Sequence, residues 1–152
     1  MARAYVGLGS NLGDREATLR RALARLNAWR GIRVLAVSRF RETEPVGFTD
    51  QPMFVNAVAA VETELDPRPL LEALLAIEQA MGRTREGPRF GPRTIDLDLL
   101  VYEDRVVDEP GLRVPHPRLH ERAFVLEPLA ELQPALIVPG VGALETLIRN
   151  LE

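Results

Sequence analysis

The pattern of hydrophobic and polar residues along the chain predicts alternating strands and helices. Four segments are short, apolar and partly alternating, as strands are: residues 3–9, 32–40, 54–65 and 91–102. Two segments between them, 14–29 and 66–82, place leucines and other apolar residues at the intervals of an amphipathic helix. The predicted order is therefore strand, helix, strand, strand, helix, strand.

This order is that of the ferredoxin-like β-α-β-β-α-β arrangement, an α+β fold. We expect a mostly antiparallel sheet with helices covering one face, in an α/β sandwich. The C-terminal part is extended through VPHPR, and residues 120–132 and 143–151 then predict extra helices. At 152 residues the chain fits a single domain, 1–152.

The last predicted strand carries two carboxylates within the otherwise apolar stretch IDLDLLVY. Strict alternation puts Ile95, Leu97, Leu99 and Val101 on one face and Asp96, Asp98, Leu100 and Tyr102 on the other. The two aspartates then project on the same side, with Cα atoms about 6.6 Å apart. Such carboxylates repel each other unless a proton or cation lies between them, and Mg²⁺ binds carboxylate and phosphate oxygens together. The alternative is a half-exposed strand whose polar face happens to carry two aspartates.

An arginine-rich loop, GRTREGPRFGPR at residues 82–93, runs directly into this strand. Arginine forks match phosphate oxygens in pairs, and a glycine-rich loop can fold over a polyphosphate. Taken alone, the loop is equally well explained as a solvated run of charge. Beside the aspartate strand, it predicts a place where cations and carboxylates meet around a metal-bound triphosphate.

Several single residues are candidates for ligand contacts, and each has a structural alternative. Glu78 falls near the apolar stripe of the second helix, where a helix-surface role is the simpler interpretation. His116 lies between two prolines and could donate to a phosphate or carry a proton, although a lone histidine is more often structural. Phe54 and Asn56 share a strand face that suits a flat heterocycle with hydrogen-bonding edges. Phe124 could form a second aromatic wall, or both phenylalanines could be core residues.

Composition excludes several classes of function. The chain has no lysine and no cysteine, which excludes a phosphate-loop lysine, a Schiff base, a thiol nucleophile and cysteine-ligated zinc. Its two serines, Ser10 and Ser38, lie outside any G-x-S-x-G motif, and the glycines of GLGSNLGD favour a tight turn over a dinucleotide fingerprint. The net charge of −3 argues against a generally basic nucleic-acid surface.

The apolar runs all fall short of the roughly 20 residues that span a bilayer. The stretch MARAYVGLGSN lacks the layout of a secretory signal. With the absence of cysteine, these features predict a cytoplasmic protein.

The chain resembles a known family in several ordered blocks. FGPRTIDLDLLVY is similar to the signature of the 6-hydroxymethyl-7,8-dihydropterin pyrophosphokinases, folate-pathway enzymes that move a diphosphate from ATP to a pterin alcohol. The other similar blocks are GLGSNLGD, ETEPVGFTDQPMFVNAV, IEQAMGRTREGPRFGPRTIDLDLL and VPHPRLHERAFVLEPLAEL. The resemblance implies a ferredoxin-like sandwich and attack by the pterin hydroxymethyl oxygen on the β-phosphorus of ATP, with AMP leaving.

The resemblance also implies roles for individual residues. It implies that the catalytic residues are Arg83, Arg93, Asp96 and Asp98, the two aspartates being ligands of two Mg²⁺ ions. It assigns ATP binding to Glu78, Arg85, Arg89, Phe90, His116 and Arg122. It assigns pterin binding to Thr43, Val46, Phe54, Asn56 and Phe124.

Two other functions stay open on the sequence. One is a different magnesium-dependent nucleotidyl or phosphoryl transferase on the same scaffold, with another acceptor. The second is a non-catalytic ferredoxin-like module that binds nucleotide or RNA through its sheet and arginine loop; the acidic net charge and the paired aspartates weigh against it. As partners we expect ATP and the hydroxymethyldihydropterin, with no nucleic acid and no membrane, and a monomer or weak homo-oligomer.

Overall fold

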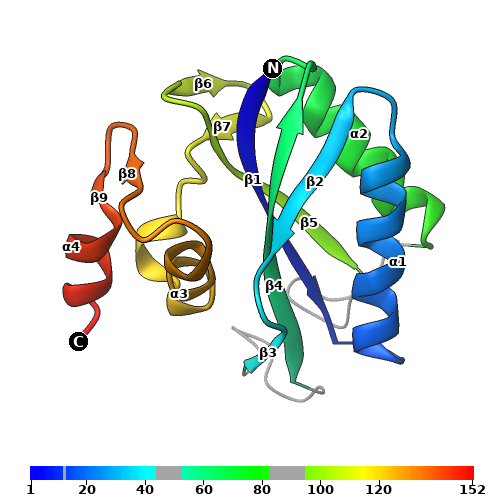
Figure 1. Cartoon of the computed structure of the whole chain (residues 1–152), viewed down its shortest axis with the longest axis horizontal. Coiled ribbons are helices and arrows are strands. Elements are labelled where there is room, and N and C mark those ends of the chain that lie inside the picture. The colour runs from blue at the N-terminus through cyan, green and yellow to red at the C-terminus, as the bar shows by residue number, and fades with distance from the viewer. Residues whose placement is uncertain (12, 44–52, 83–94) are drawn as a thin grey trace.

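The structure is a computed structural model that describes residues 1–11, 13–43, 53–82 and 95–152. Its elements are β1 (Ala2–Ser10), α1 (Arg15–Ala28), β2 (Ile32–Val37), β3 (Arg41–Thr43), β4 (Phe54–Thr63), α2 (Pro67–Ala80), β5 (Asp96–Tyr102), β6 (Val107–Glu109), β7 (Leu112–Val114), the 3-10 helix η1 (Leu119–Glu121), α3 (Ala123–Leu132), β8 (Ile137–Val138), β9 (Gly142–Ala143) and α4 (Leu144–Arg149). Figure 1 shows the main sheet between α1 and α2 on one side and α3 on the other.

The main sheet has the strand order β2-β4-β1-β5, and β3 also pairs with β4. Every neighbouring pair is antiparallel. With β2 and β3 counted as one interrupted strand, the chain order is the predicted β-α-β-β-α-β order, so the α+β ferredoxin-like prediction is confirmed. The interruption is a departure from the single strand expected at residues 32–40.

Alternation along the strands creates two separate cores. Toward α1 and α2, β1 contributes Ala4, Val6 and Leu8, which pack in one cluster with helix residues such as Leu26 and Leu74. The opposite face carries Tyr5, Val58 and Leu100, which cluster with Leu126 and Leu129 of α3. The predicted C-terminal helices therefore cover part of the second face of the sheet.

A β-bulge corrects the predicted faces of the last strand. Tyr5 pairs with Val101 but Val6 pairs with Leu99, so one extra residue stands on β5. Leu100 and Val101 consequently both join the α3 core, whereas Tyr102 turns to the α1–α2 core. Asp96 and Asp98 precede the bulge and share the face predicted for them.

Local signals at the helix ends were only partly predictive. The Asp14 carboxylate accepts the backbone N–H of Ala17 at 3.1 Å and caps α1. Asp66 occupies the corresponding position before α2, but its side chain makes no capping hydrogen bond; Pro67 is the first helical residue. Along the described parts of the chain, no helix has both the length and the apolar character needed to cross a membrane.

Candidate active site

Three adjacent strands place an amide, a glycine and a carboxylate in one row. Gly9 of β1 pairs with Asn56 of β4 on one side and with Asp96 of β5 on the other. A Cβ atom at Gly9 would lie 2.7 Å from the Asn56 Oδ1 and 3.7 Å from the Phe54 Cδ1. The Asn56 amide oxygen therefore lies directly over Gly9, where only a residue without a side chain leaves room for it, and the Phe54 ring lies next to it.

The predicted pterin residues of β3 and β4 that the structure describes lie next to one another beside Gly9. Thr43 pairs with Phe54, and the Asn56 Nδ2 donates a hydrogen bond to the Thr43 Oγ1. Asn56 is buried, and this bond directs its Oδ1 toward Gly9. A buried amide oxygen held in this way is a preorganised acceptor for a ring N–H or amino group.

The described residues at the start of α3 add an aromatic ring and a cation on the same side of the sheet. Phe124 packs against the cluster that contains Val58 and Leu100. The Arg122 guanidinium carbon lies 5.5 Å from the centroid of the Phe124 ring, which is within cation–π range. Phe124 thus packs on the face of the sheet that carries Asn56 and the two aspartates, and its place opposite Phe54 stays a prediction.

Arg122 also lies within electrostatic reach of the paired aspartates. Burial lowers the pKa of the Arg122 guanidinium, and the charges of Asp98 and Asp96 oppose that change. Asp98 pairs with Gly7 and Asp96 with Gly9, so β1 places no side chain beside either carboxylate. Among the described residues, Arg122 thus brings a positive charge within electrostatic reach of both carboxylates.

His116 is held beside β5 as a neutral imidazole. Its backbone N–H donates to the Leu100 carbonyl at 2.9 Å, and its Nδ1 accepts the backbone N–H of Arg118 at 3.2 Å. Burial, together with the charges of Arg122 and Arg118, lowers the pKa of His116 to about 4. At neutral pH the single ring proton is therefore on Nε2, where it can be donated to a ligand.

Glu78 has a structural contact that the sequence did not reveal. It is 5% exposed, and its Oε2 accepts the backbone N–H of Leu97 at 2.7 Å. Leu97 stands between the two aspartates on β5, at the edge of the sheet. The helix-surface interpretation of Glu78 is wrong, because the carboxylate supports the strand that carries Asp96 and Asp98.

The donor set at the aspartates suits a metal that arrives with phosphate. Within the described residues there is no group of three or more histidines, aspartates or glutamates that could hold an ion by themselves. Two carboxylates, opposite Gly9 and Gly7, supply oxygen donors, and oxygen atoms of a ligand would supply others. Mg²⁺ is commonly held by one or two carboxylates together with substrate phosphates, so the residues fit Mg²⁺.

Several predicted site residues lie outside the described residues: Val46, Arg83, Arg85, Arg89, Phe90 and Arg93. Among the described residues, Gly9 is the contributor that sequence analysis missed. A signal for it was present, because the spacing of Gly7 and Gly9 equals that of Asp96 and Asp98. Two residues of one strand at this spacing share a face, so two glycines leave that face of the strand without side chains.

Replacing Glu78 tests its role as a support for β5. We expect Glu78→Ala to lower the free energy of unfolding by about 1–3 kcal/mol, since the buried Leu97 N–H loses its acceptor. Glu78→Gln keeps an acceptor oxygen and should cost less. Chemical denaturation measures both, with the exposed helix residue Glu72, changed to Ala, as the control. Equal stabilities of Glu78→Ala and Glu72→Ala would contradict the role.

The depressed pKa of His116 predicts a pH dependence of stability. Its folded pKa, about 4, is below the ordinary value of 6.5, so between these values the unfolded chain binds more protons. This contribution to stability is complete above about pH 6.5 and is lost as the pH falls toward about 4. Between pH 7.5 and pH 5, His116→Gln should therefore lose less unfolding free energy than the unmodified chain. Substitution of the exposed His120 with Gln is the control, and parallel losses in all three proteins would refute the assignment.

Comparison with known proteins relates the chain to a family. The sequence profile of 7,8-dihydro-6-hydroxymethylpterin-pyrophosphokinase (HPPK) matches residues 5–134. The chain is 51% identical over 149 residues to a 2-amino-4-hydroxy-6-hydroxymethyldihydropteridine pyrophosphokinase of Methylorubrum extorquens, covering 98% of this chain and 94% of the relative. It is 50% identical over 129 residues to the protein of the same name from Bacillus subtilis, covering 85% and 77%.

Solved structures support the fold independently. A crystal structure of Plasmodium falciparum HPPK-DHPS matches with a TM-score of 0.77 at 14% sequence identity. The match covers 98% of this chain but 45% of that one, so this chain spans less than half of the larger protein. From the sequence relationships, the chain belongs to the 7,8-dihydro-6-hydroxymethylpterin-pyrophosphokinase family.

Proposed function

We propose that this pyrophosphokinase transfers a diphosphate from ATP to 6-hydroxymethyl-7,8-dihydropterin, a step of folate biosynthesis, on the sheet face around Gly9. The observation that carries the proposal is the row of Asn56, Gly9 and Asp96 across three strands. Two strand spacings separate the amide and the carboxylate by about 10 Å, a span suited to a two-ring heterocycle and its reacting arm. Gly9 adds no side chain of its own between them.

On the pterin side, the buried Asn56 amide would read the hydrogen-bonding edge of the ring. Thr43 holds that amide in place through the hydrogen bond from its Nδ2. Phe54, which lies next to Gly9, and Phe124 on α3 would enclose the ring from its two faces. Val46, which lies outside the described residues, retains its predicted pterin contact.

On the nucleotide side, the reaction forms a bond from the hydroxymethyl oxygen to the β-phosphorus and breaks the bond from that phosphorus to the oxygen bridging to the α-phosphate. AMP leaves, and the hydroxyl proton is lost. Asp96, in the row with Gly9, would accept a hydrogen bond from the attacking hydroxyl and orient it. Two Mg²⁺ ions, held by Asp96 and Asp98 with phosphate oxygens, would offset charge on the transferred group.

Cationic and neutral donors complete the proposed nucleotide site. Arg122 lies within reach of both aspartates and would balance phosphate charge, and the His116 Nε2–H would donate to a phosphate oxygen. Glu78, the residue that supports β5, also keeps its predicted place near ATP. The arginines outside the described residues keep their predicted roles: Arg83 and Arg93 in catalysis, Arg85 and Arg89 in ATP binding, with Phe90 beside them.

The surroundings of the reaction are proposed with it. We infer a cytoplasmic protein that acts as a monomer or weak homo-oligomer and binds neither nucleic acid nor membrane. The net charge of −3 supports the absence of a nucleic-acid partner. The absence of cysteine agrees with a reducing compartment.

The identity of the nucleotide product tests the reaction, and Asp98 tests the site. With ATP, Mg²⁺ and the reduced hydroxymethylpterin, the chain should release AMP. Asp98→Ala should abolish turnover, because one of the two carboxylates that hold the metal-bound phosphates is removed. Nucleotide chromatography measures AMP and ADP, and circular dichroism checks that the variant is folded.

The matched control for this test is Asp108→Ala. Asp108 is an exposed aspartate of β6 that pairs with the surface residue Arg113 at 3.3 Å, so its loss should leave turnover unchanged. ADP as the product would show ordinary kinase chemistry with another acceptor. Salt-dependent RNA binding without ATP turnover would favour the non-catalytic module, and near-normal rates in Asp98→Ala would reject the metal site.

Gly9→Ala tests whether Asn56 binds the pterin. The new Cβ would meet the Asn56 Oδ1 at 2.7 Å and displace the amide from its place beside Thr43. Loss of one hydrogen bond predicts a rise of roughly three- to tenfold in the KM for the pterin, with a smaller change in the KM for ATP. Gly7→Ala is the control for the pterin KM alone, because its Cβ would meet the Leu100 side chain at 3.4 Å and not Asn56; its turnover is not compared, since Gly7 lies opposite Asp98. The same pterin KM in both variants would count against this role of Asn56.

A further inference from the structure

The break between β2 and β3 leaves backbone groups outside the regular ladder. Val37 pairs with Ala59, and the next paired residue, Arg41, lies opposite Asn56. Three residues, 38–40, thus face two on β4. Ser38 repairs part of the break: its backbone N–H donates to the Val58 carbonyl at 2.9 Å and its Oγ accepts the Val58 N–H at 2.9 Å.

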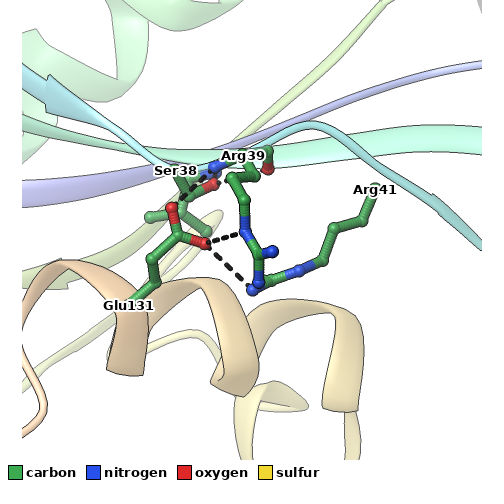
Figure 2. Close-up of polar contacts among 5 residues, drawn as sticks. Ser38, Arg39, Arg41 and Glu131 are labelled. Carbon is green, nitrogen blue, oxygen red and sulfur yellow. Dashed lines mark hydrogen bonds and ion pairs between the residues drawn. The ribbon is translucent and has the colours of Figure 1, made fainter.

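The carboxylate of Glu131 accepts hydrogen bonds from Arg39 and Arg41, which follow Ser38 in this break (Figure 2). Its Oε2 accepts the backbone N–H of Arg39 at 2.8 Å. Its Oε1 lies 3.3 Å from the Arg39 Nε and 2.9 Å from the Arg41 Nη2. One side chain of α3 is therefore bound to the backbone of the break and to the first residue of β3, about 90 positions earlier in the chain.

This cluster of Arg39, Arg41 and Glu131 is partly protected from water. The side chains of Arg41 and Glu131 are 23% and 28% exposed, whereas Arg39 is 77% exposed. Burial raises the pKa of Glu131, but the hydrogen bonds from Arg39 and the charge of Arg41 outweigh it and lower the pKa overall. The carboxylate is thus ionised at neutral pH, and its pair with Arg41 is screened less than an exposed one.

The cluster lies beside the residues expected to contact the pterin. Arg41 is the register partner of Asn56, and Thr43 follows on the same face of β3. On the other element, Glu131 stands in the last turn of α3, whose first turn carries Phe124. The ion pair with Glu131 therefore joins the two elements that are proposed to enclose the ring.

β3 depends on side-chain contacts because it is only three residues long and pairs with β4 at the edge of the sheet. On its opposite face, Arg15 of α1 donates to the Glu42 carboxylate at 2.9 Å and to the Met53 carbonyl at 2.6 Å. That contact ties β3 to α1 and to the start of β4. It does not connect β3 to α3, whereas the hydrogen bond from Arg41 to Glu131 does.

We propose that Glu131 is a positioning residue that sets the spacing between β3 and α3 and thereby the width of the pterin site. This inference rests on the proposed function, because it concerns the same site. Glu131 acts through Arg39 and Arg41 and does not itself contact a reactant. Its loss lets β3 move away from α3, carrying Thr43 and the amide of Asn56 out of line with Phe124.

The test compares Glu131→Ala and Glu131→Gln in steady-state kinetics with each substrate varied in turn. We expect Glu131→Ala to raise the KM for the hydroxymethylpterin by about three- to tenfold, with the KM for ATP and the kcat within about twofold of the unmodified chain. Glu131→Gln keeps the acceptor for the Arg39 N–H but loses the ionic contact, so its effect should be smaller. Because Gln has the shape of Glu, it also provides a folded variant if Ala does not.

The matched control is Glu127→Ala, an exposed glutamate one turn earlier on α3, which should leave both KM values unchanged. A double-mutant cycle with Arg41→Met adds a readout that general destabilisation would not give. If Glu131 acts through Arg41, the combined variant should raise the pterin KM less than the product of the single effects.

Two results would overturn the inference. One is an unchanged pterin KM in Glu131→Ala and Glu131→Gln. The second is an equal rise in both KM values with a matching fall in kcat, which would show a purely structural role. AMP release by the unmodified chain separates this failure from failure of the proposed function: if AMP forms while the Glu131 variants keep a normal pterin KM, only the inference about Glu131 is lost.

Discussion

The antiparallel pairing of β5 with β1 is the constraint on which the rest of the site depends. It places Asp96 opposite Gly9 and Asp98 opposite Gly7, so each carboxylate has a neighbour without a side chain. Since alternation sends Leu97 and Leu99 into the α1–α2 core, the aspartates cannot leave the opposite face without exposing those leucines. The hydrophobic core therefore fixes the direction of the two charges, and the glycines place no side chain of β1 beside them.

Two helix glutamates complete parts of the sheet that strand pairing leaves unfinished. Glu78 of α2 accepts the Leu97 N–H at the edge of the sheet, and Glu131 of α3 accepts the Arg39 N–H at the break between β2 and β3. Buried or half-buried backbone groups need such partners, because leaving one unpaired is costly. One of these supports lies between the two aspartates, and the other lies next to the strand that faces Asn56. The sheet face that carries Asn56, Asp96 and Asp98 thus depends on carboxylates that come from the helix layers on both sides of the sheet.

Local periodicity was sufficient to predict the framework and one side of the site. The element order, the shared face of Asp96 and Asp98 and the shared face of Phe54 and Asn56 all follow from alternation along an uninterrupted strand. The prediction failed for Val101 and Tyr102 because a bulge opposite Tyr5 and Val6 shifts the register, and a bulge depends on the partner strand. For the same reason β2 was predicted too long.

Contacts between distant segments explain what the sequence could not supply. Ser38 was considered only as a nucleophile, yet it repairs a strand break. Glu131 was not singled out at all, since its partners are about 90 positions away and no spacing rule connects them. Glu78 was recognised near the apolar stripe, but its burial against Leu97 depends on how α2 packs on β5. Periodicity determines which face a residue occupies, whereas tertiary packing determines what it meets there.

The charges of the site also show why net charge predicts ligands poorly. The chain as a whole is acidic, with a net charge of −3, which weighs against a polyanion bound over a broad surface. At the candidate site, however, Arg118 and Arg122 are close enough to lower the pKa of His116, and Arg122 also interacts with Asp98. Screening limits such effects to about 8–10 Å in physiological salt, so a compact triphosphate experiences the local arrangement of charges and not the total. The acidic total therefore does not argue against a bound nucleotide.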